Sequence, residues 1–238
     1  MLVGVLNYGA GNLGSVMNAL SRLGVGARFV EGPGELDPAA SPFDGMVFPG
    51  DGHFASAMNA LRAAGYAGAL KGWIEAGRPF LGICIGMQVL FEASEEAPGV
   101  KGLGVIRGAV KRFPGRKVPQ IGWNETAAQE GSRLFRGCRG SRQSNGANDA
   151  ITSNDNAFFY YIHSYYCAPL DSAGVAAVTD YYLPYCSAFE RGNLAAVQFH
   201  PEKSGEAGLR LLRNWAETVP VPERERETVP EMVPEMLR

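Results

Sequence analysis

Ten consecutive residues decide the fold of this chain: Pro79-Phe80-Leu81-Gly82-Ile83-Cys84-Ile85-Gly86-Met87-Gln88. They begin with an apolar run, for which we predict a strand over 79–83, and a helical pattern follows over about 86–91. Gly82 and Gly86 flank Cys84 and leave room for a tight turn, because glycine carries no side chain. The stretch therefore predicts a strand, a sharp turn at the cysteine and a helix, the order from which parallel α/β sheets are built.

The residues before this stretch repeat the same alternation. Apolar runs predict strands over 2–6, 27–30 and 45–48, and helical spacing appears over 13–23 and over 54–76, with a break near Gly65. This rhythm predicts a mostly parallel, open sheet with helices on both faces.

The residues after about 103 show a different pattern. Strand patterns appear over 105–113, 160–167, 175–182, 187–191 and 194–199, and an amphipathic helix follows over 205–215. We therefore expect an antiparallel β portion in the second half of a single domain that spans 1–217. Residues 137–156 are polar, which predicts a surface insertion, and the proline-containing residues 218–238 predict a C-terminal tail without stable structure.

Composition argues against several classes of function. The formal net charge of -2 argues against a nucleic-acid binder, since phosphate contacts need a concentrated Lys/Arg surface. No apolar run approaches the roughly 20 residues that span a bilayer, and no basic leader precedes the first strand, so we expect no membrane segment and no signal peptide. The four cysteines are too widely spaced for a zinc site or a disulfide framework. We expect reduced cysteines, a cytoplasmic location, and neither a metal nor a cofactor.

Cys84 stands where a nucleophile is expected, because Gly82-Ile83-Cys84-Ile85-Gly86 is the cysteine version of the G-x-S-x-G elbow. Such a turn lifts the side chain clear of the sheet edge, and the partial positive charge at a helix N-terminus favours the thiolate. The alternative is a buried structural cysteine, and we keep that interpretation for Cys138, Cys167 and Cys186. For Cys84 the flanking glycines and the strand–turn–helix context favour a nucleophile.

His200 is the best candidate for the base that such a nucleophile needs. It ends a predicted strand and is followed by Pro201 and Glu202. At spacing i, i+2 on an extended segment, the side chains of His200 and Glu202 point to one side. Glu202 would hold the imidazole while His200 exchanges a proton with Cys84.

The other two histidines fit this role less well, and one loop could complete the site. His53 follows a glycine-rich turn and His163 lies inside a predicted strand, and neither has a carboxylate at a useful spacing. Acyl chemistry also needs donors for an oxyanion. Pro49-Gly50-Asp51-Gly52 follows a predicted strand, so its N–H groups could face the same edge, although taken alone this run predicts only a turn.

Together these motifs resemble the class I, or triad, glutamine amidotransferases, whose fold is flavodoxin-like. The two anchors of the resemblance are the elbow at 82–88 and His200-Pro201-Glu202. More specifically, the chain is similar to the glutaminase subunit of imidazole glycerol phosphate synthase, which serves histidine biosynthesis. The marks of that subunit lie in its order over residues 1–217: Tyr8-Gly9-Ala10-Gly11-Asn12, Pro49-Gly50-Asp51-Gly52, Pro119-Gln120-Ile121-Gly122-Trp123-Asn124, His163-Ser164-Tyr165 and His200-Pro201-Glu202-Lys203-Ser204.

The resemblance implies a role for each matching position. Cys84 would attack the side-chain amide of glutamine and form a glutamyl thioester, with His200 and Glu202 completing the triad. The backbone at Gly50, Asp51 and Gly52 would hold the oxyanion. Glutamine would be contacted by Gln88, Glu96, Ser164 and Tyr165, and the partner by Asn12, Gln120, Trp123 and Lys203. The implied partner is a cyclase subunit, a TIM barrel that consumes the ammonia, in a heterodimer.

The chain departs from this family at a few positions. The family usually has an apolar residue where this chain has Asp51. Because a carboxylate aimed at the oxyanion would oppose it, we expect the Asp51 side chain to point away. The polar residues 137–156 and the tail 218–238 are longer than the family needs.

Three alternatives stay open at this point. A dinucleotide-binding protein would use Gly9-Ala10-Gly11-Asn12-Leu13-Gly14, which fits G-x-G-x-x-G after a strand, with Glu31 as the ribose-binding acid. That interpretation leaves the cysteine elbow and the His-x-Glu pair unexplained. A catalytically inactive relative is a second alternative, against which the intact triad residues argue. The third is a glutaminase that serves another synthase.

Overall fold

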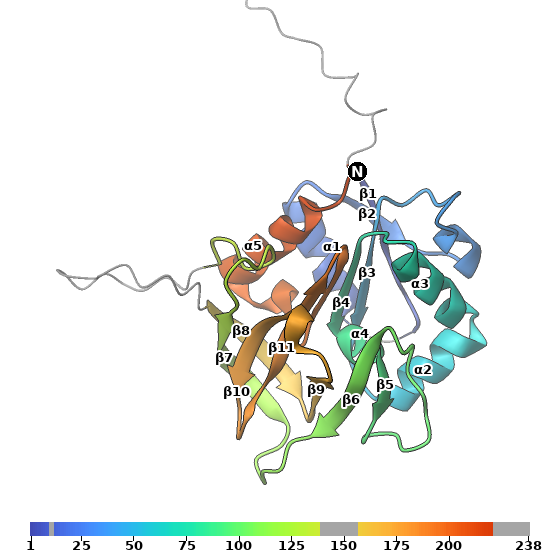
Figure 1. Ribbon diagram of the computed structural model, residues 1–238. Coiled ribbons are helices and arrows are strands. Elements are labelled where there is room, and N and C mark those ends of the chain that lie inside the picture. The colour runs from blue at the N-terminus through green and yellow to red at the C-terminus, as the bar shows by residue number, and fades with distance from the viewer. Residues whose placement is uncertain (10–11, 139–156, 221–238) are drawn as a thin grey trace, which may run out of the picture.

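The computed structural model describes residues 1–9, 12–138 and 157–220, which Figure 1 draws in colour. Most of the predicted insertion over 137–156 and of the predicted tail over 218–238 lies outside the described residues. No helix among the described residues is both long and apolar enough to cross a membrane.

The first half of the chain forms the parallel part of the sheet (Figure 1). Its strands are β1 (Leu2–Val5), β2 (Gly26–Phe29), β3 (Gly45–Gly50) and β4 (Phe80–Cys84). Its helices are α1 (Leu13–Arg22), η1 (Pro33–Leu36), α2 (Phe54–Ala63), α3 (Tyr66–Glu75) and α4 (Ile85–Gln88). The strands β2, β1, β3, β4 and β12 (Leu194–Val197) follow one another in the sheet and are all parallel. The prediction of a mostly parallel sheet is confirmed.

The second half extends this sheet with antiparallel strands. They are β7 (Gln120–Ala128), β8 (Ala157–His163), β10 (Val175–Asp180) and β11 (Pro184–Arg191), and the sheet order continues from β12 through β11, β10 and β7 to β8. A branch of β5 (Phe91–Ser94), β6 (Ile106–Arg112) and β9 (Tyr165–Pro169) leaves the sheet at β11. The remaining elements are η2 (Ser172–Gly174), η3 (Pro201–Lys203) and α5 (Gly205–Ala216). The predicted antiparallel portion is confirmed.

The largest differences from the predicted boundaries concern the helix after Cys84 and the strand that contains His163. The helix predicted over 86–91 ends at Gln88. N–H groups of the loop that follows donate to the carbonyl groups that a longer helix would use for its own hydrogen bonds. Leu103 donates its N–H to the carbonyl of Val89, and Val105 donates to that of Leu90. The strand predicted over 160–167 breaks at Ser164, since β8 pairs with β7 whereas β9 pairs with β6 and β11.

Two apolar cores lie on opposite faces of the parallel strands. Along β3, Val47 faces the core that α1 and α5 cover, and Met46 and Phe48 face the core that α2 and α3 cover. Alternate residues of a strand point to opposite faces, so a strand covered on both sides is apolar throughout. Every residue of β3 and of β4 is buried, as this arrangement requires.

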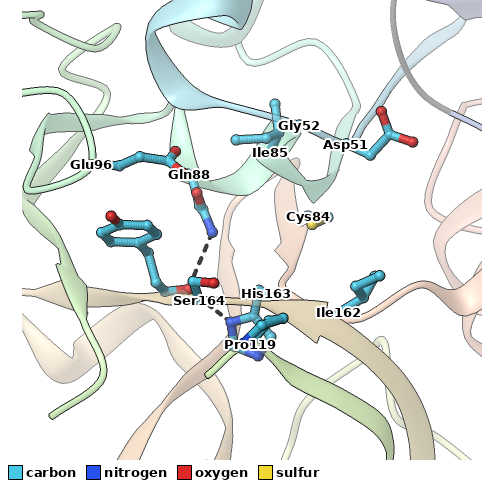
Figure 2. Close-up of a pocket in the computed structure, with 11 residues that line it drawn as sticks. Asp51, Gly52, Cys84, Ile85, Gln88, Glu96, Pro119, Ile162, His163 and Ser164 are labelled. Atoms are coloured by element: carbon cyan, nitrogen blue, oxygen red, sulfur yellow. Dashed lines mark hydrogen bonds between the residues drawn. The ribbon is translucent and has the colours of Figure 1, made fainter. Parts of the chain in front are cut away.

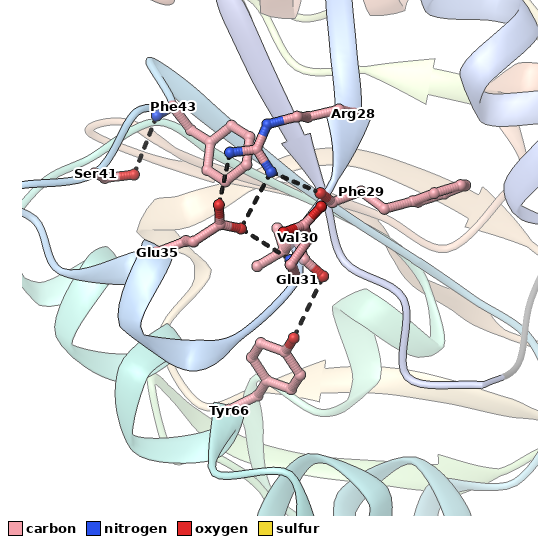
Figure 3. A network of polar contacts seen from close by, with 8 residues as sticks. All are labelled: Arg28, Phe29, Val30, Glu31, Glu35, Ser41, Phe43 and Tyr66. Atoms are coloured by element: carbon pink, nitrogen blue, oxygen red, sulfur yellow. Dashed lines mark hydrogen bonds and ion pairs between the residues drawn. The ribbon is translucent and has the colours of Figure 1, made fainter.

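A polar network fixes the outer strand β2 to the turn that follows it (Figure 3). The Arg28 guanidinium donates two hydrogen bonds to the Glu35 carboxylate, at 2.6 and 3.2 Å, and lies over the Phe43 ring. Glu35 also accepts the backbone N–H of Glu31. The backbone of Glu31 is thus held by this network. Glu31 is the residue that would bind the ribose in the dinucleotide alternative.

Candidate active site

Cys84 lies at a sharp reversal of the backbone between β4 and α4. Its φ is 54° and its ψ is −107°, a conformation that L-residues rarely adopt. A side chain at Gly86 would overlap the Phe48 carbonyl, and one at Gly82 would overlap the backbone of Gly86. Both flanking positions therefore require glycine. Because α4 is a single turn, its dipole at Cys84 is smaller than that of the longer helix predicted from the sequence.

Three strand ends bring the candidate residues to one edge of the sheet. The register pairs Gly50 of β3 with Cys84 of β4, and Val197 of β12 with Ile83. Parallel strands end at the same edge, so the oxyanion candidate, the cysteine and the segment that leads to His200 lie next to one another.

His200 and Glu202 form a buried pair. The Nδ1–H of His200 donates to Oε1 of Glu202 at 2.9 Å, and the two side chains are 3% and 2% exposed. The predicted pair forms, but its backbone is not extended as predicted, because Glu202 lies in the 3₁₀ turn η3. Ser204 fixes this turn by donating its hydroxyl to the His200 carbonyl at 2.6 Å.

The charge state of His200 suits proton transfer. Burial alone would lower its pKa, but the interactions with Cys84 and Glu202 outweigh burial and raise the pKa to about 10. Its Nε2 makes no hydrogen bond to any described residue. Nε2 is thus the nitrogen through which His200 could exchange a proton with a neighbouring group.

A cavity of about 220 Å³ opens beside the cysteine (Figure 2). Its volume is below the range of roughly 300–1,000 Å³ typical of drug-sized ligands, so it suits a substrate as small as one amino acid. No group of three or more His, Cys, Asp or Glu side chains within the described ranges could hold a metal ion. The cavity is lined by Asp51, Gly52, Cys84, Ile85, Gln88, Glu96, Pro119, Ile162, His163, Ser164 and Tyr165.

The four predicted substrate residues, Gln88, Glu96, Ser164 and Tyr165, all line this cavity. The Nε2 of Gln88 donates to the Tyr165 carbonyl at 3.2 Å, one of the dashed lines in Figure 2. Glu96 is also held in place, because its Oε2 accepts the N–H of Phe54, the first residue of α2, at 2.7 Å. Contacts within the chain therefore hold the Glu96 carboxylate and the Gln88 amide in place on one wall of the cavity.

Tyr8 holds the backbone of the candidate oxyanion loop, a role that the sequence did not predict for it. The Tyr8 hydroxyl donates to the carbonyl of Asp51 at 3.0 Å. In a trans peptide the carbonyl and the next N–H point in opposite directions, so this contact also orients the N–H of Gly52. The side chain of Asp51 is exposed, and in Figure 2 its carboxylate points away from the Cys84 sulfur.

His163 lines the cavity and is held by a buried hydrogen-bond network. Its Nδ1 lies 2.7 Å from the Tyr165 carbonyl, and its Nε2 lies 3.0 Å from Oε1 of Gln120 and 3.2 Å from the Tyr185 hydroxyl. Burial, with a contribution from His200, lowers the pKa of His163 to about 4. His163 is thus neutral at pH 7, and its hydrogen bonds hold the carbonyl that Gln88 also contacts.

The four predicted partner residues divide into two groups. Trp123 is 57% exposed, Lys203 is exposed and Asn12, the N-cap residue of α1, is half-buried. Gln120 is only 4% exposed and is bonded to His163 and Tyr185. In strand β7 the Gln120 side chain points inward, whereas that of Trp123 points toward solvent.

Gln198 is the buried neighbour of Cys84 that sequence reasoning missed. Its Nε2 donates to the Cys84 sulfur at 3.6 Å. The signal was present in the sequence, since Gln198 precedes His200 by two residues at a strand end and so shares its side of the chain. Only the register between β12 and β4 shows that this side faces Cys84.

Comparison with known proteins identifies the class to which this fold and site belong. The family model described as glutamine amidotransferase class-I matches residues 5–219. The chain therefore belongs to the class-I glutamine amidotransferases and is an enzyme of that class. The glycine-rich run over 9–14, which alone fitted a dinucleotide-binding pattern, lies within the matched residues.

Curated relatives narrow the family to proteins named imidazole glycerol phosphate synthase subunit HisH. The Deinococcus radiodurans protein is 45% identical over 89% of this chain and 91% of its own length. That of Chloroflexus aurantiacus is 44% identical over 92% and 98%, and that of Methanothermobacter thermautotrophicus is 42% identical over 92% and 99%. The predicted resemblance is confirmed.

Solved structures agree on the fold. PurLQS from Thermotoga maritima superposes with a TM-score of 0.67 at 17% identity, covering 91% of this chain and 97% of that one. A structure described as a glutamine amidotransferase gives a TM-score of 0.65 at 21% identity, covering 90% and 97%. At such identities the likeness shows the fold alone.

The packing of the elbow leads to a first prediction. Gly86→Ala should prevent the native turn at Cys84, because the added methyl group would overlap the Phe48 carbonyl and neither backbone can yield. We expect a loss of at least about 3 kcal/mol in the unfolding free energy, as for severe core disruption. Urea unfolding measures it. Gly14→Ala, in a helix and with open space around it, is the control and should not destabilise the chain. Equal stability of the two variants would contradict the packing argument.

A second prediction concerns the acid sensitivity that His163 gives the fold. Its pKa falls from 6.5 to about 4 on folding, so the folded state binds fewer protons and this contribution is present above pH 6.5 and lost as the pH falls toward 4. Between pH 7.5 and pH 5 the wild type should lose about 2 kcal/mol more than His163→Gln, which lacks this titration. Urea unfolding at both pH values tests this. Parallel losses would show that the pKa of His163 is not lowered.

Proposed function

We propose that this chain hydrolyses glutamine to glutamate and ammonia through a thioester on Cys84, and that it passes the ammonia to a cyclase subunit. The observation that carries the proposal is Cys84 in a strained elbow at the wall of a 220 Å³ cavity, next to the buried His200–Glu202 pair. The ammonia would serve the synthesis of imidazole glycerol phosphate, the compound in the relatives' name. The family resemblance extends this to the aminoimidazole carboxamide ribonucleotide and to histidine biosynthesis. We place this activity in the cytoplasm, and Cys84, Cys167 and Cys186 are free thiols, as that compartment favours.

The first half of the reaction forms the thioester. The Cys84 thiolate attacks the side-chain carbonyl carbon of glutamine, and the carbonyl electrons move to its oxygen. Backbone N–H groups of residues 50–52 stabilise this oxyanion. His200 is protonated at neutral pH because its pKa is raised to about 10, and it gives its proton to the amide nitrogen as the carbon–nitrogen bond breaks. Ammonia leaves, and the glutamyl group stays on the sulfur.

The second half releases glutamate. His200, now neutral, takes a proton from a water molecule that attacks the thioester carbon, and the carbon–sulfur bond breaks to restore the thiolate. Glu202 keeps the imidazole in one orientation throughout, since its Oε1 accepts the Nδ1–H. The pair of Cys84 and His200 returns to its starting charge state.

The cavity wall can recognise the amino-acid end of glutamine. Both N–H bonds of the Gln88 amide are used inside the protein, one to the Tyr165 carbonyl and one to Gln198. Its Oε1 is therefore the atom that would accept a hydrogen bond from the α-ammonium group of the substrate. The Glu96 carboxylate on the same wall adds a negative charge that suits this cation.

An exposed apolar patch on β7 and β8 is our candidate surface for the cyclase. Ile121, Trp123, Phe158 and Ile162 are 62%, 57%, 52% and 41% exposed. Ile121 pairs with Ile162 in the register, so the patch crosses both strands on one face. Large apolar side chains gathered on a surface mark a protein interface, and Trp is prominent among interface hot spots.

The position of this patch suits ammonia transfer. Ile162 belongs both to the patch and to the lining of the cavity. A partner seated on the patch would therefore also cover the cavity mouth. Ammonia released there would pass to the partner before water could protonate it. Exposed Lys203 and half-buried Asn12 are further candidates for contacts to this partner.

The decisive test of the proposed chemistry is Cys84→Ala. Removing the nucleophile should lower glutamate release by the complex with the cognate cyclase at least about 10³-fold. The same complex supplied with ammonium salt should still make product, since the cyclase chemistry takes place elsewhere. Cys186→Ala, which removes a buried thiol hydrogen-bonded to the Ala188 carbonyl, is the matched control and should retain activity. Substantial hydrolysis by Cys84→Ala would refute the thioester.

The docking surface is tested by Trp123→Ala. Loss of an exposed aromatic anchor should weaken binding of the cyclase by about 30-fold or more, measured by titration calorimetry. Stability should change by no more than about 0.5 kcal/mol, because the side chain is mostly in solvent. Leu170→Ala is the control, as this side chain is 71% exposed but lies outside the patch. Weaker binding by the control and not by Trp123→Ala would place the cyclase on another surface.

A further inference from the structure

Gln198 carries a buried amide that has no role in the reaction described so far. Its side chain is fully buried and lies just after β12, two residues before His200. Its Oε1 accepts the Nε2–H of Gln88 at 3.1 Å and lies 3.8 Å from the Cys167 sulfur. Its Nε2 donates to the Cys84 sulfur at 3.6 Å. An amide removed from water must find such partners, or its burial is costly.

The direction of this amide follows from a backbone carbonyl. The carbonyl of Tyr165 can only accept, so the Gln88 amide must turn its NH₂ group toward it. The second N–H of that group then faces Gln198, whose oxygen must be the atom that receives it. The NH₂ group of Gln198 is left facing Cys84. The orientation is thus imposed by the chain.

An N–H directed at sulfur favours the thiolate over the thiol. A thiolate accepts a hydrogen bond far better than a neutral sulfur does, since hydrogen bonds to charged groups are roughly twice as strong. Burial strengthens the effect, because no water competes at Gln198. We propose that Gln198 stabilises the Cys84 thiolate and holds its sulfur in place for attack. This inference rests on the proposed function, in which Cys84 is the nucleophile.

The same contacts connect the nucleophile to substrate recognition. The amide that faces Cys84 and the amide that faces the α-ammonium group of glutamine are bonded to each other. Gln198 therefore also fixes the orientation of the Gln88 amide, which lines the cavity. One buried residue sets both the state of the sulfur and the orientation of a substrate ligand.

The test is the rate at which iodoacetamide alkylates Cys84 in the full chain, followed by peptide mass spectrometry from about pH 5.5 to 10. Gln198→Met keeps the length and burial of the side chain but has no N–H. In the acidic part of the profile, below its midpoint, alkylation should be about tenfold slower than in the wild type, because the profile should move up by about one pH unit. At the alkaline end the two rates should converge, because the thiol is then ionised in both proteins.

Cys167→Ala provides the matched control. It alters the packing on the oxygen side of the same amide without touching the donor that faces Cys84. Its alkylation profile should follow that of the wild type. If Gln198→Met does not fold by circular dichroism, Gln198→Leu removes the same amide from the same site and gives the same comparison.

The outcomes separate this inference from the proposed function. Slower alkylation that converges at high pH supports the role of Gln198. A profile equal to that of the wild type, or one slowed equally at every pH, overturns it while leaving Cys84 as the nucleophile. If alkylation of Cys84 in the wild type leaves glutamine hydrolysis intact, the proposed function fails and the inference falls with it.

Discussion

The reversal of the backbone at Cys84 is the constraint on which the site depends. A positive φ at a cysteine costs on the order of 1–3 kcal/mol and persists only where the surroundings impose it. Here Gly82 and Gly86 let the neighbouring backbone approach closely, and the Phe48 carbonyl fills the space that a side chain would need. The turn therefore belongs to the packing of β3 against α4. Without it the sulfur would stay within the sheet, away from His200.

The antiparallel half contributes what the parallel half lacks. The parallel strands bring Cys84 and the segment that leads to His200 to one edge, but part of the cavity lining comes from residues 162–165 of the second half. The break at Ser164 turns the chain between β8 and β9 and brings the Tyr165 carbonyl to the cavity. That carbonyl orients Gln88, and strand β7, which pairs with β8, presents Trp123 to solvent. The sheet edge that carries Cys84 is thus joined, through residues 162–165, to the surface that we propose for the partner.

Two buried histidines show how surroundings decide chemistry. Burial by itself lowers the pKa of both histidines. With all interactions included, the pKa of His163 falls to about 4, whereas that of His200 rises to about 10. The difference lies in their partners. His200 has Glu202 and the Cys84 sulfur, both of which favour a positive charge, and His163 has neutral groups and the repulsion of His200. One histidine therefore suits proton transfer, and the other suits a fixed hydrogen-bond network.

The sequence by itself determined the fold class and the elements that carry the chemistry. Glycine spacing around Cys84 and apolar periodicity are local signals, because they report on turns and on strands that any neighbour can cover. The tertiary structure decided which side chains meet. It turned Gln120 inward although Trp123, in the same motif, points out. It also placed Gln198 against Cys84, which are far apart in the chain. Such contacts follow from strand order and register, and no local pattern encodes them.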